Sequence, residues 1–254
     1  ANLQLVEPFI RFSPLVRQGL KFRKRFEAAK KAIATPPWAW YPYDSFANLF
    51  YLQILMKRSG LSLERLTGNH SLLDMGAADG ALSFFFESLG FDVECWDHAE
   101  TNINGMAALH DLSRALGSRV AIRNLDMDTA FELTRQFDLC LFLGTLYHLK
   151  NPFYALEKLA AHAKFCFVST RIARQSPDGA VNFEDLPMAY LVDADQCNND
   201  STNYWIFSPA GLNRLTHQAG WDICASATAG PAASRPDSPD ADERMFLLLR
   251  SRHS

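Results

Sequence analysis

Residues 71–80 read Ser-Leu-Leu-Asp-Met-Gly-Ala-Ala-Asp-Gly, and this stretch decides the fold. A short apolar run ends at Asp74, a loop of small residues follows, and a helix-like apolar stretch extends from Ala81 to Leu89. A strand, a tight turn of small residues and a helix form the nucleotide-binding corner of an open α/β sheet. The small side chains let the backbone approach a ligand closely, and the start of the helix offers free N–H donors.

The spacing of the small residues narrows the choice of ligand. A dinucleotide-binding turn has Gly-x-Gly-x-x-Gly, but from Gly76 onward the second and third glycine positions hold Ala78 and Ala81. A phosphate-binding loop would need Gly-Lys-Ser/Thr before its helix, and this loop lacks it. The pattern Asp74-x-Gly76-x-Ala78-x-Gly80 instead resembles the first motif of class I S-adenosylmethionine (SAM)-dependent methyltransferases. That ligand is a cation, so an acid at the turn can pair with its ammonium group. The alternative is a plain strand-to-helix turn.

Two later acids favour the SAM interpretation. Residues 92–97 alternate like a strand and end at Asp97, which His98 follows. A carboxylate at the end of a second strand, about 20 residues past the glycine turn, is placed to bind ribose hydroxyls. A third strand is predicted at 119–125, with Asp126 after it. The methyltransferase resemblance implies that this acid accepts a hydrogen bond from the adenine amino group and that the next residue, Met127, covers the ring. Each acid alone fits a solvated strand end, but three after successive strands favour one ligand.

The fourth predicted strand, 137–143, runs into Gly-Thr-Leu-Tyr-His at 144–148. Ligands bind beyond the carboxyl ends of parallel strands, which places Tyr147 and His148 at the mouth of the site. The pattern Gly-x-Leu-Tyr-His-x-x-x-Pro resembles the tRNA wobble-uridine carboxymethyltransferases, and the similarity covers roughly residues 70–225, including Asn-Tyr-Trp-Ile-Phe-Ser at 203–208. Those enzymes transfer a carboxymethyl group from carboxy-SAM to a 5-hydroxyuridine oxygen. The predicted cofactor-binding residues are Asp74, Gly76, Ala78, Gly80, Asp97, His98, Asp126, Met127, Leu143 and Gly144.

One position departs from that family. The resemblance implies an arginine that helps to hold the extra carboxylate, where this chain has Thr202 next to Asn203. A neutral threonine cannot form a charge-assisted, bidentate bond. Arg171 or Arg174 could substitute from another direction, but nothing in the sequence shows that either does. The sequence therefore favours SAM over carboxy-SAM as the donor, with S-adenosylhomocysteine (SAH) as the product.

The Tyr-His pair carries the predicted chemistry. His148 has a suitable unperturbed pKa, about 6.5, for a base that accepts the acceptor's proton. The alternative for His148 is a structural histidine that bonds a loop carbonyl. Tyr147 is predicted to orient the acceptor, or else it simply packs over the donor.

The N-terminal 70 residues predict a helical extension. A strongly basic helix is expected from Leu15 to Ile33, and a second helix from Phe46 to Arg58, capped by Ser45. The basic residues of the first helix either bind RNA phosphates or form a solvent-exposed helical face. The overall net charge of −3 favours the solvent-exposed face. Between the helices lie aromatic residues that form a lid over SAM or acceptor, or else pack into the core: Trp38, Trp40, Tyr41 and Tyr43. The predicted substrate-contacting residues are these four with Arg171 and Asn203.

Alternating segments predict the rest of the fold. Strands are expected at 71–75, 92–97, 119–125, 137–143, 164–170, 221–228 and 244–250, and helices at 80–89, 102–116, 152–162 and 209–219. This alternation predicts a mostly parallel α/β sheet with helices on both faces. No helical pattern joins the last two strands, so the last strand is expected to be antiparallel, which gives a Rossmann-like seven-stranded methyltransferase sheet. The predicted organisation is a helical extension at 1–70 and a SAM-binding domain at 71–254, with an insertion at 173–204 that suits a lid.

Composition restricts the remaining possibilities. The chain has 254 residues, of which 48% are hydrophobic, enough for one α/β domain with an extension. Its five cysteines are scattered, so we expect a reducing, cytoplasmic setting without disulfides or a metal site. No apolar run approaches the ~18 residues of a membrane span, and the N-terminus does not resemble a signal peptide.

Three functions are consistent with these patterns. The favoured one is a SAM-dependent methyltransferase that acts on an oxygen or nitrogen of a small molecule. The second is a tRNA wobble-uridine methyl- or carboxymethyltransferase, and the third is a non-catalytic SAM-binding protein. The sequence does not indicate an oligomeric state.

Overall fold

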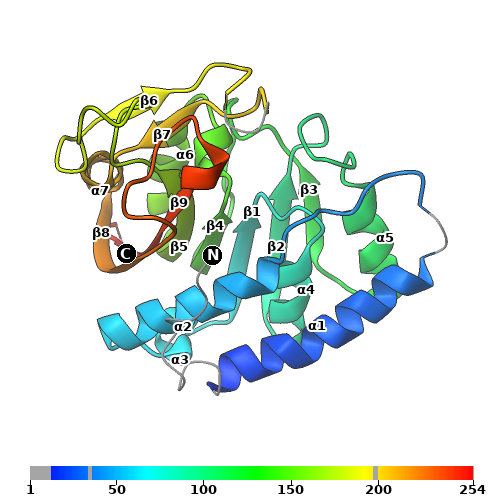
Figure 1. The fold of residues 1–254 in the computed structure, drawn as a ribbon. Coiled ribbons are helices and arrows are strands. Elements are labelled where there is room, and N and C mark those ends of the chain that lie inside the picture. The colour runs from blue at the N-terminus through cyan, green and yellow to red at the C-terminus, as the bar shows by residue number, and fades with distance from the viewer. Residues whose placement is uncertain (1–12, 34–35, 197–199, 254) are drawn as a thin grey trace. The chain divides into compact units, whose positions relative to one another are not determined.

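The computed structural model describes residues 13–33, 36–196 and 200–253 and shows a mixed α/β fold (Figure 1). Its strands are β1 (Ser71–Met75), β2 (Asp92–Asp97), β3 (Ala121–Asn124), β4 (Phe137–Leu143), β5 (Ala163–Ile172), β6 (Ala189–Leu191), β7 (Trp205–Phe207), β8 (Trp221–Ala229) and β9 (Glu243–Ser251). Its helices are α1 (Pro14–Ala32), α2 (Asn48–Ser59), α3 (Leu63–Leu66), α4 (Ala81–Ser88), α5 (Ala107–Leu116), α6 (Pro152–Ala160) and α7 (Pro209–Gln218). Short 3₁₀ turns occur at η3 (Ser45–Ala47), η4 (Leu146–His148) and η5 (Pro239–Ala241).

The chain forms two compact units, and the first contains the described residues up to Asp126 together with Phe137–Leu141. Its strands follow the order β3-β2-β1-β4. Strands β1, β2 and β3 are parallel, and their register pairs Met75 with Trp96 and Asp97 with Asn124. The carboxyl ends of these three strands therefore lie side by side, which is where an open α/β sheet binds its ligand.

Helix α1 closes the apolar core of the first unit. Its buried residues recur at helical spacing, and it packs against α2, α4 and α5 (Figure 1). The rings of Phe22, Phe26, Phe46 and Phe85 form one aromatic cluster, with centroids 5.7–6.4 Å apart. This packing attaches the N-terminal segment to α4, the helix that follows residues 76–80. The division at residue 70 stays a prediction.

The second unit contains residues 127–136 and the chain from Phe142 onward. Strand β5 pairs with β9 in antiparallel orientation, β9 pairs with β8 in the same way, and Ile172 of β5 pairs with Phe207 of β7 in parallel. The last strand is therefore antiparallel, as predicted. Strands β6 and β7 were not predicted, because each has only three residues.

Three predicted boundaries were wrong. The helix expected at 102–116 begins at Ala107, because the side chain of Asn102 accepts the backbone N–H groups of Asn104 and Met106 and holds a turn there. Ser45 is not the cap of a helix, since Asp44 caps η3 and α2 begins only at Asn48. The third strand is shorter than predicted, at Ala121–Asn124.

Three sequence-based expectations concern disulfides, metal binding and membrane spans. Cys95, Cys140, Cys166 and Cys224 are free thiols, and Cys197 lies outside the described residues. Within the described ranges, no cluster of His, Cys, Asp and Glu side chains is arranged to hold a metal ion. None of the helices described here combines the length and apolar character needed to cross a membrane.

Candidate functional site

The loop between β1 and α4, residues 76–80, is wrapped against the end of β2. The backbone N–H groups of Gly76 and Ala77 both donate to the carbonyl of Trp96, at 2.8 and 3.2 Å. Gly76, Ala78 and Gly80 all have positive φ, which explains why small residues occupy these positions. At Gly80 a Cβ would in addition overlap the side chains of Leu109 and Phe84. We call residues 76–80 the donor loop.

Asp97 joins the donor loop to the end of β2. One carboxylate oxygen accepts the N–H of Ala78 at 2.7 Å and the other accepts the N–H of His98 at 2.8 Å. Burial raises the pKa of Asp97, and the two backbone N–H groups oppose that rise. The carboxylate thus stands at the strand end that the sequence predicts for ribose binding.

Asp74 is buried one residue before the end of β1. Its carboxylate accepts the hydroxyl of Ser83 at 2.6 Å, and only 4% of the residue is exposed. Burial raises the pKa of Asp74 to about 7, and the hydrogen bond from Ser83 opposes the rise while the charge of Asp97 adds to it. Ser83 was missed by the sequence reasoning, because a serine in the first turn of a helix has no distinctive signal.

Asp126 lies half-buried two residues beyond β3. The neighbouring residue, Leu125, donates its N–H to the carbonyl of Asp97 at 2.9 Å, which holds this segment against the end of β2. On the other side, the side chain of Asn124 accepts the N–H of Ala99 at 3.0 Å. The structure therefore brings Asp74, Asp97 and Asp126 to the adjacent carboxyl ends of three parallel strands.

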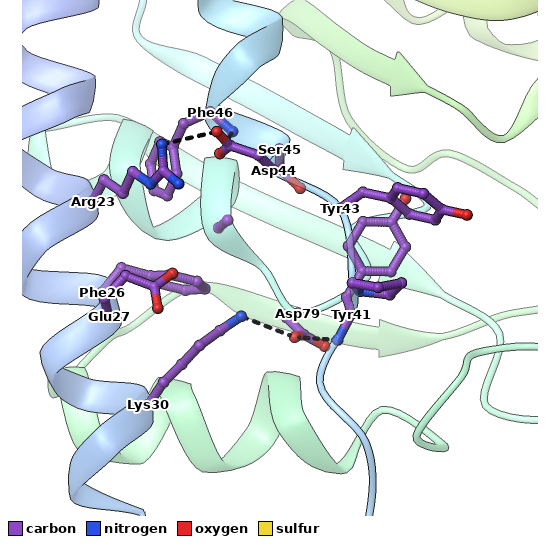
Figure 2. A pocket seen from close by; sticks show the side chains of 12 residues that line it. Arg23, Phe26, Glu27, Lys30, Tyr41, Tyr43, Asp44, Ser45, Phe46 and Asp79 are labelled. Atoms are coloured by element: carbon purple, nitrogen blue, oxygen red, sulfur yellow. Dashed lines mark hydrogen bonds and ion pairs between the residues drawn. The ribbon is translucent and has the colours of Figure 1, made fainter.

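Asp79 is a residue of the donor loop that the sequence reasoning did not single out. It is 3% exposed and accepts the backbone N–H of Tyr41 and the side-chain N–H of Asn104, both at 2.9 Å. Lys30 of α1 places its ammonium 3.4 Å from the same carboxylate (Figure 2). These partners come from positions 25 to 49 residues away, so no local pattern could have revealed them.

The four predicted lid aromatics lie outside the buried core. Trp38, Trp40 and Tyr41 are half-buried, and Tyr43 is 67% exposed. Tyr41 and Tyr43 border a cavity of about 250 Å³, which is also lined by side chains of α1, by Asp79 and by Ala81 (Figure 2). The lid role of these four residues stays a prediction.

In the second unit, Tyr147 and His148 form η4 just after β4. The ring of Tyr147 belongs to a small buried cluster and is 8% exposed, while its hydroxyl accepts a hydrogen bond from Arg244 at 3.3 Å. The guanidinium of Arg244 also lies over the ring, 5.6 Å from its centroid. Arg244, on β9, is a charged neighbour of Tyr147 that could not be found from the sequence, because the two residues are 97 positions apart.

His148 is oriented by the segment that the sequence comparison with the wobble-uridine enzymes singled out. Its Nδ1 lies 2.9 Å from Oγ1 of Thr202 and 3.2 Å from the Thr202 carbonyl. The Thr202 hydroxyl donates to Asp200 at 2.6 Å. Since that hydroxyl has one proton, Nδ1 of His148 must donate, and this assigns the free lone pair to Nε2. Burial lowers the pKa of His148, and Asp200 opposes the change.

Arg171 and Arg174, the suggested substitutes for the missing arginine, are held in ion pairs. Arg171 is 3% exposed and bonds Asp242 at 2.7 Å. Arg174 makes a bidentate pair with Glu243, at 2.9 Å for both bonds, and also bonds Glu184 at 3.0 Å. These guanidinium groups are engaged by carboxylates of the protein itself.

The other predicted residues of the second unit are Met127, Leu143, Gly144 and Asn203. Met127 is 5% exposed and Asn203 is 4% exposed. Leu143 ends β4, and the N–H of Gly144 donates to the carbonyl of Ser169 at 2.9 Å. The roles assigned to these residues stay predictions.

Comparison with protein families gives a match over residues 43–226, to the methyltransferase domain family. The chain belongs to this family. The matched region includes the donor loop, the three strand-end acids and the Tyr-His pair of η4. No curated protein matches the sequence significantly.

Solved structures share the methyltransferase fold at low sequence identity. The N-terminal domain of EvdMO1, solved with SAH bound, is 18% identical, with a TM-score of 0.56 over 91% of this chain and 97% of that chain. The [4+2]-cyclase SpnF is 14% identical, with a TM-score of 0.57 over 94% and 97%. A SAM-dependent methyltransferase from Clostridium acetobutylicum ATCC 824 is 11% identical, with a TM-score of 0.54 over 91% and 99%. At these identities the likeness shows the fold.

Proposed function

We propose that this methyltransferase-family protein uses SAM to methylate an oxygen or nitrogen of a small-molecule acceptor. The observation that carries the proposal is the set of three acids, Asp74, Asp97 and Asp126, at the ends of adjacent parallel strands around a small-residue loop. Such a site offers carboxylates to an ammonium, to ribose hydroxyls and to an adenine amino group, and the same carboxylates would repel a pyrophosphate. The SAH bound in the EvdMO1 domain supports the same donor.

The transfer needs little covalent help from the protein. The acceptor atom displaces the methyl group from a sulfonium that is already activated, so the protein mainly aligns the two and excludes water. A hydroxyl or protonated amine must also lose a proton. His148 is the proposed base, because its lowered pKa keeps it neutral near pH 7 and its Nε2 carries the lone pair.

Isothermal titration calorimetry with SAH tests the donor site directly. We expect the wild-type protein to bind SAH with a micromolar dissociation constant, and Asp97→Ala to bind at least about 100-fold more weakly, since it loses charge-assisted hydrogen bonds to the ribose. Asp92→Ala is a matched control, because Asp92 is an exposed acid at the opposite end of the same strand. A wild-type protein that does not bind SAH or SAM would rule out the proposed function.

A second candidate is transfer of a carboxymethyl group from carboxy-SAM, as in the wobble-uridine enzymes. The contact between Arg244 and the Tyr147 hydroxyl favours it, since it supplies a cation that Thr202 does not. Competition between SAM and carboxy-SAM distinguishes the two donors. A preference for carboxy-SAM of tenfold or more that Arg244→Met abolishes would support the second candidate, and equal or weaker binding of carboxy-SAM would support plain methyl transfer.

The case for RNA as the acceptor is weaker. Three of the seven cations of α1 are used within the protein: Arg23 pairs with Asp44, Arg25 donates to the carbonyl of Leu116, and Lys30 pairs with Asp79. We therefore prefer a small acceptor. A non-catalytic role is disfavoured because all three acids are kept.

A further inference from the structure

We propose that Asp79 is a positioning residue that couples donor binding to the position of the aromatic segment 36–44, here called the strap. The inference rests on the proposed function, since it takes the donor loop to be the place where SAM binds. The side chain of Asp79 is turned toward Tyr41 of the strap and Lys30 of α1 (Figure 2).

Two hydrogen-bonded tethers connect the strap to the donor loop. The N–H of Tyr41 donates directly to Asp79 at 2.9 Å. The side-chain N–H₂ group of Asn104 donates to Asp79 at 2.9 Å and to the carbonyl of Ala39 at 3.2 Å, so it bridges the two segments. The strap is thus held by its backbone, at positions on both sides of Trp40.

Lys30 supplies the charge that a buried carboxylate needs. Its ammonium lies 3.4 Å from Asp79, and 4.9 and 5.0 Å from the ring centroids of Trp40 and Phe26. The side chain of Lys30 is only 16% exposed. An ion pair and cation–π contacts in such a place are stronger than at an open surface, and removing either charge leaves the other without compensation.

Through these contacts, the position of the strap depends on the position of the donor loop. The N–H of Ala78 is bonded to Asp97, and the next residue, Asp79, holds the strap. A ligand that fixes the loop therefore also fixes Tyr41 and Lys30, and a strap that leaves its place releases the loop. By thermodynamic linkage, SAM must favour the docked strap by the same factor by which the docked strap favours SAM.

Hydrogen–deuterium exchange of residues 36–44, measured with and without SAH beside the SAH dissociation constant, tests the coupling. In the wild type, SAH is expected to slow exchange in the strap. Asp79→Asn and Lys30→Met are expected to weaken SAH binding about tenfold and to abolish this SAH-dependent protection. Lys30→Arg keeps the cation and is expected to restore affinity to within threefold of the wild type, which loss of packing alone would not predict.

Asp44→Asn is the matched control. Asp44 forms an ion pair with Arg23 of α1 at 2.9 Å and caps η3. It takes no part in the two tethers that connect the strap to Asp79. Because both tethers to Asp79 remain in this variant, it is expected to keep the SAH affinity within twofold of the wild type and to keep the SAH-dependent protection of the strap. Equal weakening of SAH binding by Asp44→Asn and Asp79→Asn would overturn the inference.

The outcomes separate this inference from the proposed function. A wild type that does not bind SAH contradicts the proposed function itself. A wild type that binds SAH, with Asp79→Asn and Lys30→Met unchanged in affinity and protection, contradicts only the coupling. If Asp79→Asn unfolds, as thermal unfolding would reveal, the pair Lys30→Met and Lys30→Arg decides the question.

Discussion

Asp74 has an unusual electrostatic position for a residue that is proposed to pair with a cation. It is buried, its pKa is raised from 3.8 to about 7, and the charge of Asp97 opposes its ionisation. In the unfolded chain the same carboxyl ionises near pH 4. The folded protein without ligand therefore retains this proton more readily, and the contribution of Asp74 to stability falls as the pH rises from about 4 to 7.

The ammonium group of SAM or SAH reverses this preference, because pairing with it favours the carboxylate form of Asp74. We expect SAH to bind more tightly as the pH rises from 5.5 to 7.5, with affinity increasing up to about tenfold per pH unit below 7 and levelling off above it. Asp74→Asn, which can still accept the Ser83 hydroxyl, should bind more weakly and with little pH dependence over this range. Calorimetric titrations at three pH values measure the effect. An equal slope in wild type and Asp74→Asn would assign the pH dependence to another group.

At the residue scale, the sequence identified some site residues and could not identify others. Asp74, Asp97 and Asp126 were predicted because each follows a recognisable strand, and their common location follows from the parallel register of β1, β2 and β3. Asp79 was quoted in the motif but received no role. Its partners, from α1, the strap and the turn before α5, become neighbours only when the chain folds.

At the element scale, one buried serine connects α7 with the segment before it. Ser208 is fully buried and caps α7 by accepting the N–H of Gly211 at 2.8 Å. It also accepts the N–H of Met188 at 3.2 Å and donates to the carbonyl of Leu186. The same side chain thus begins a helix and holds the entry to β6.

Ser208→Ala should therefore cost more than the loss of an ordinary cap. It leaves the N–H of Gly211, the N–H of Met188 and the carbonyl of Leu186 with fewer partners, and we expect the free energy of unfolding to fall by about 2–3 kcal/mol. Ser62→Ala removes the exposed cap of the four-residue α3 and should cost about 0.5 kcal/mol. Urea denaturation of both variants measures the difference. Similar losses would show that the extra contacts of Ser208 contribute little.

The long elements were predicted well, and the short ones were not. Strands β1, β2 and β4 have the predicted bounds, because their apolar runs end at clear turn signals. Strands β6 and β7 form within and just after the predicted insertion, and three residues are too few to show a period. The two strands pair with each other in antiparallel orientation, and β7 pairs with β5 only through Ile172 and Phe207.

At the scale of the whole molecule, the methyltransferase family match and the observed fold agree with each other, but the fold does not identify the reaction. This chain resembles both the [4+2]-cyclase SpnF and the C. acetobutylicum methyltransferase in fold, at low sequence identity. Fold alone therefore leaves the chemistry to the side chains of the site. For this chain those are the three strand-end acids on one hand and Tyr147, His148 and Arg244 on the other.

The sheet, residues 76–80 and the acids at the strand ends can be predicted from the sequence alone, because hydrophobic period, small residues and strand-end positions are local properties of the chain. The electrostatic environment and the partners of the site residues arise from tertiary packing. It set the pKa of Asp74 by burial, placed Arg244 on Tyr147, fixed His148 through Thr202 and bound the strap to Asp79. Burial and contact between distant segments exist only in the folded chain, and they determine what the local motif can bind.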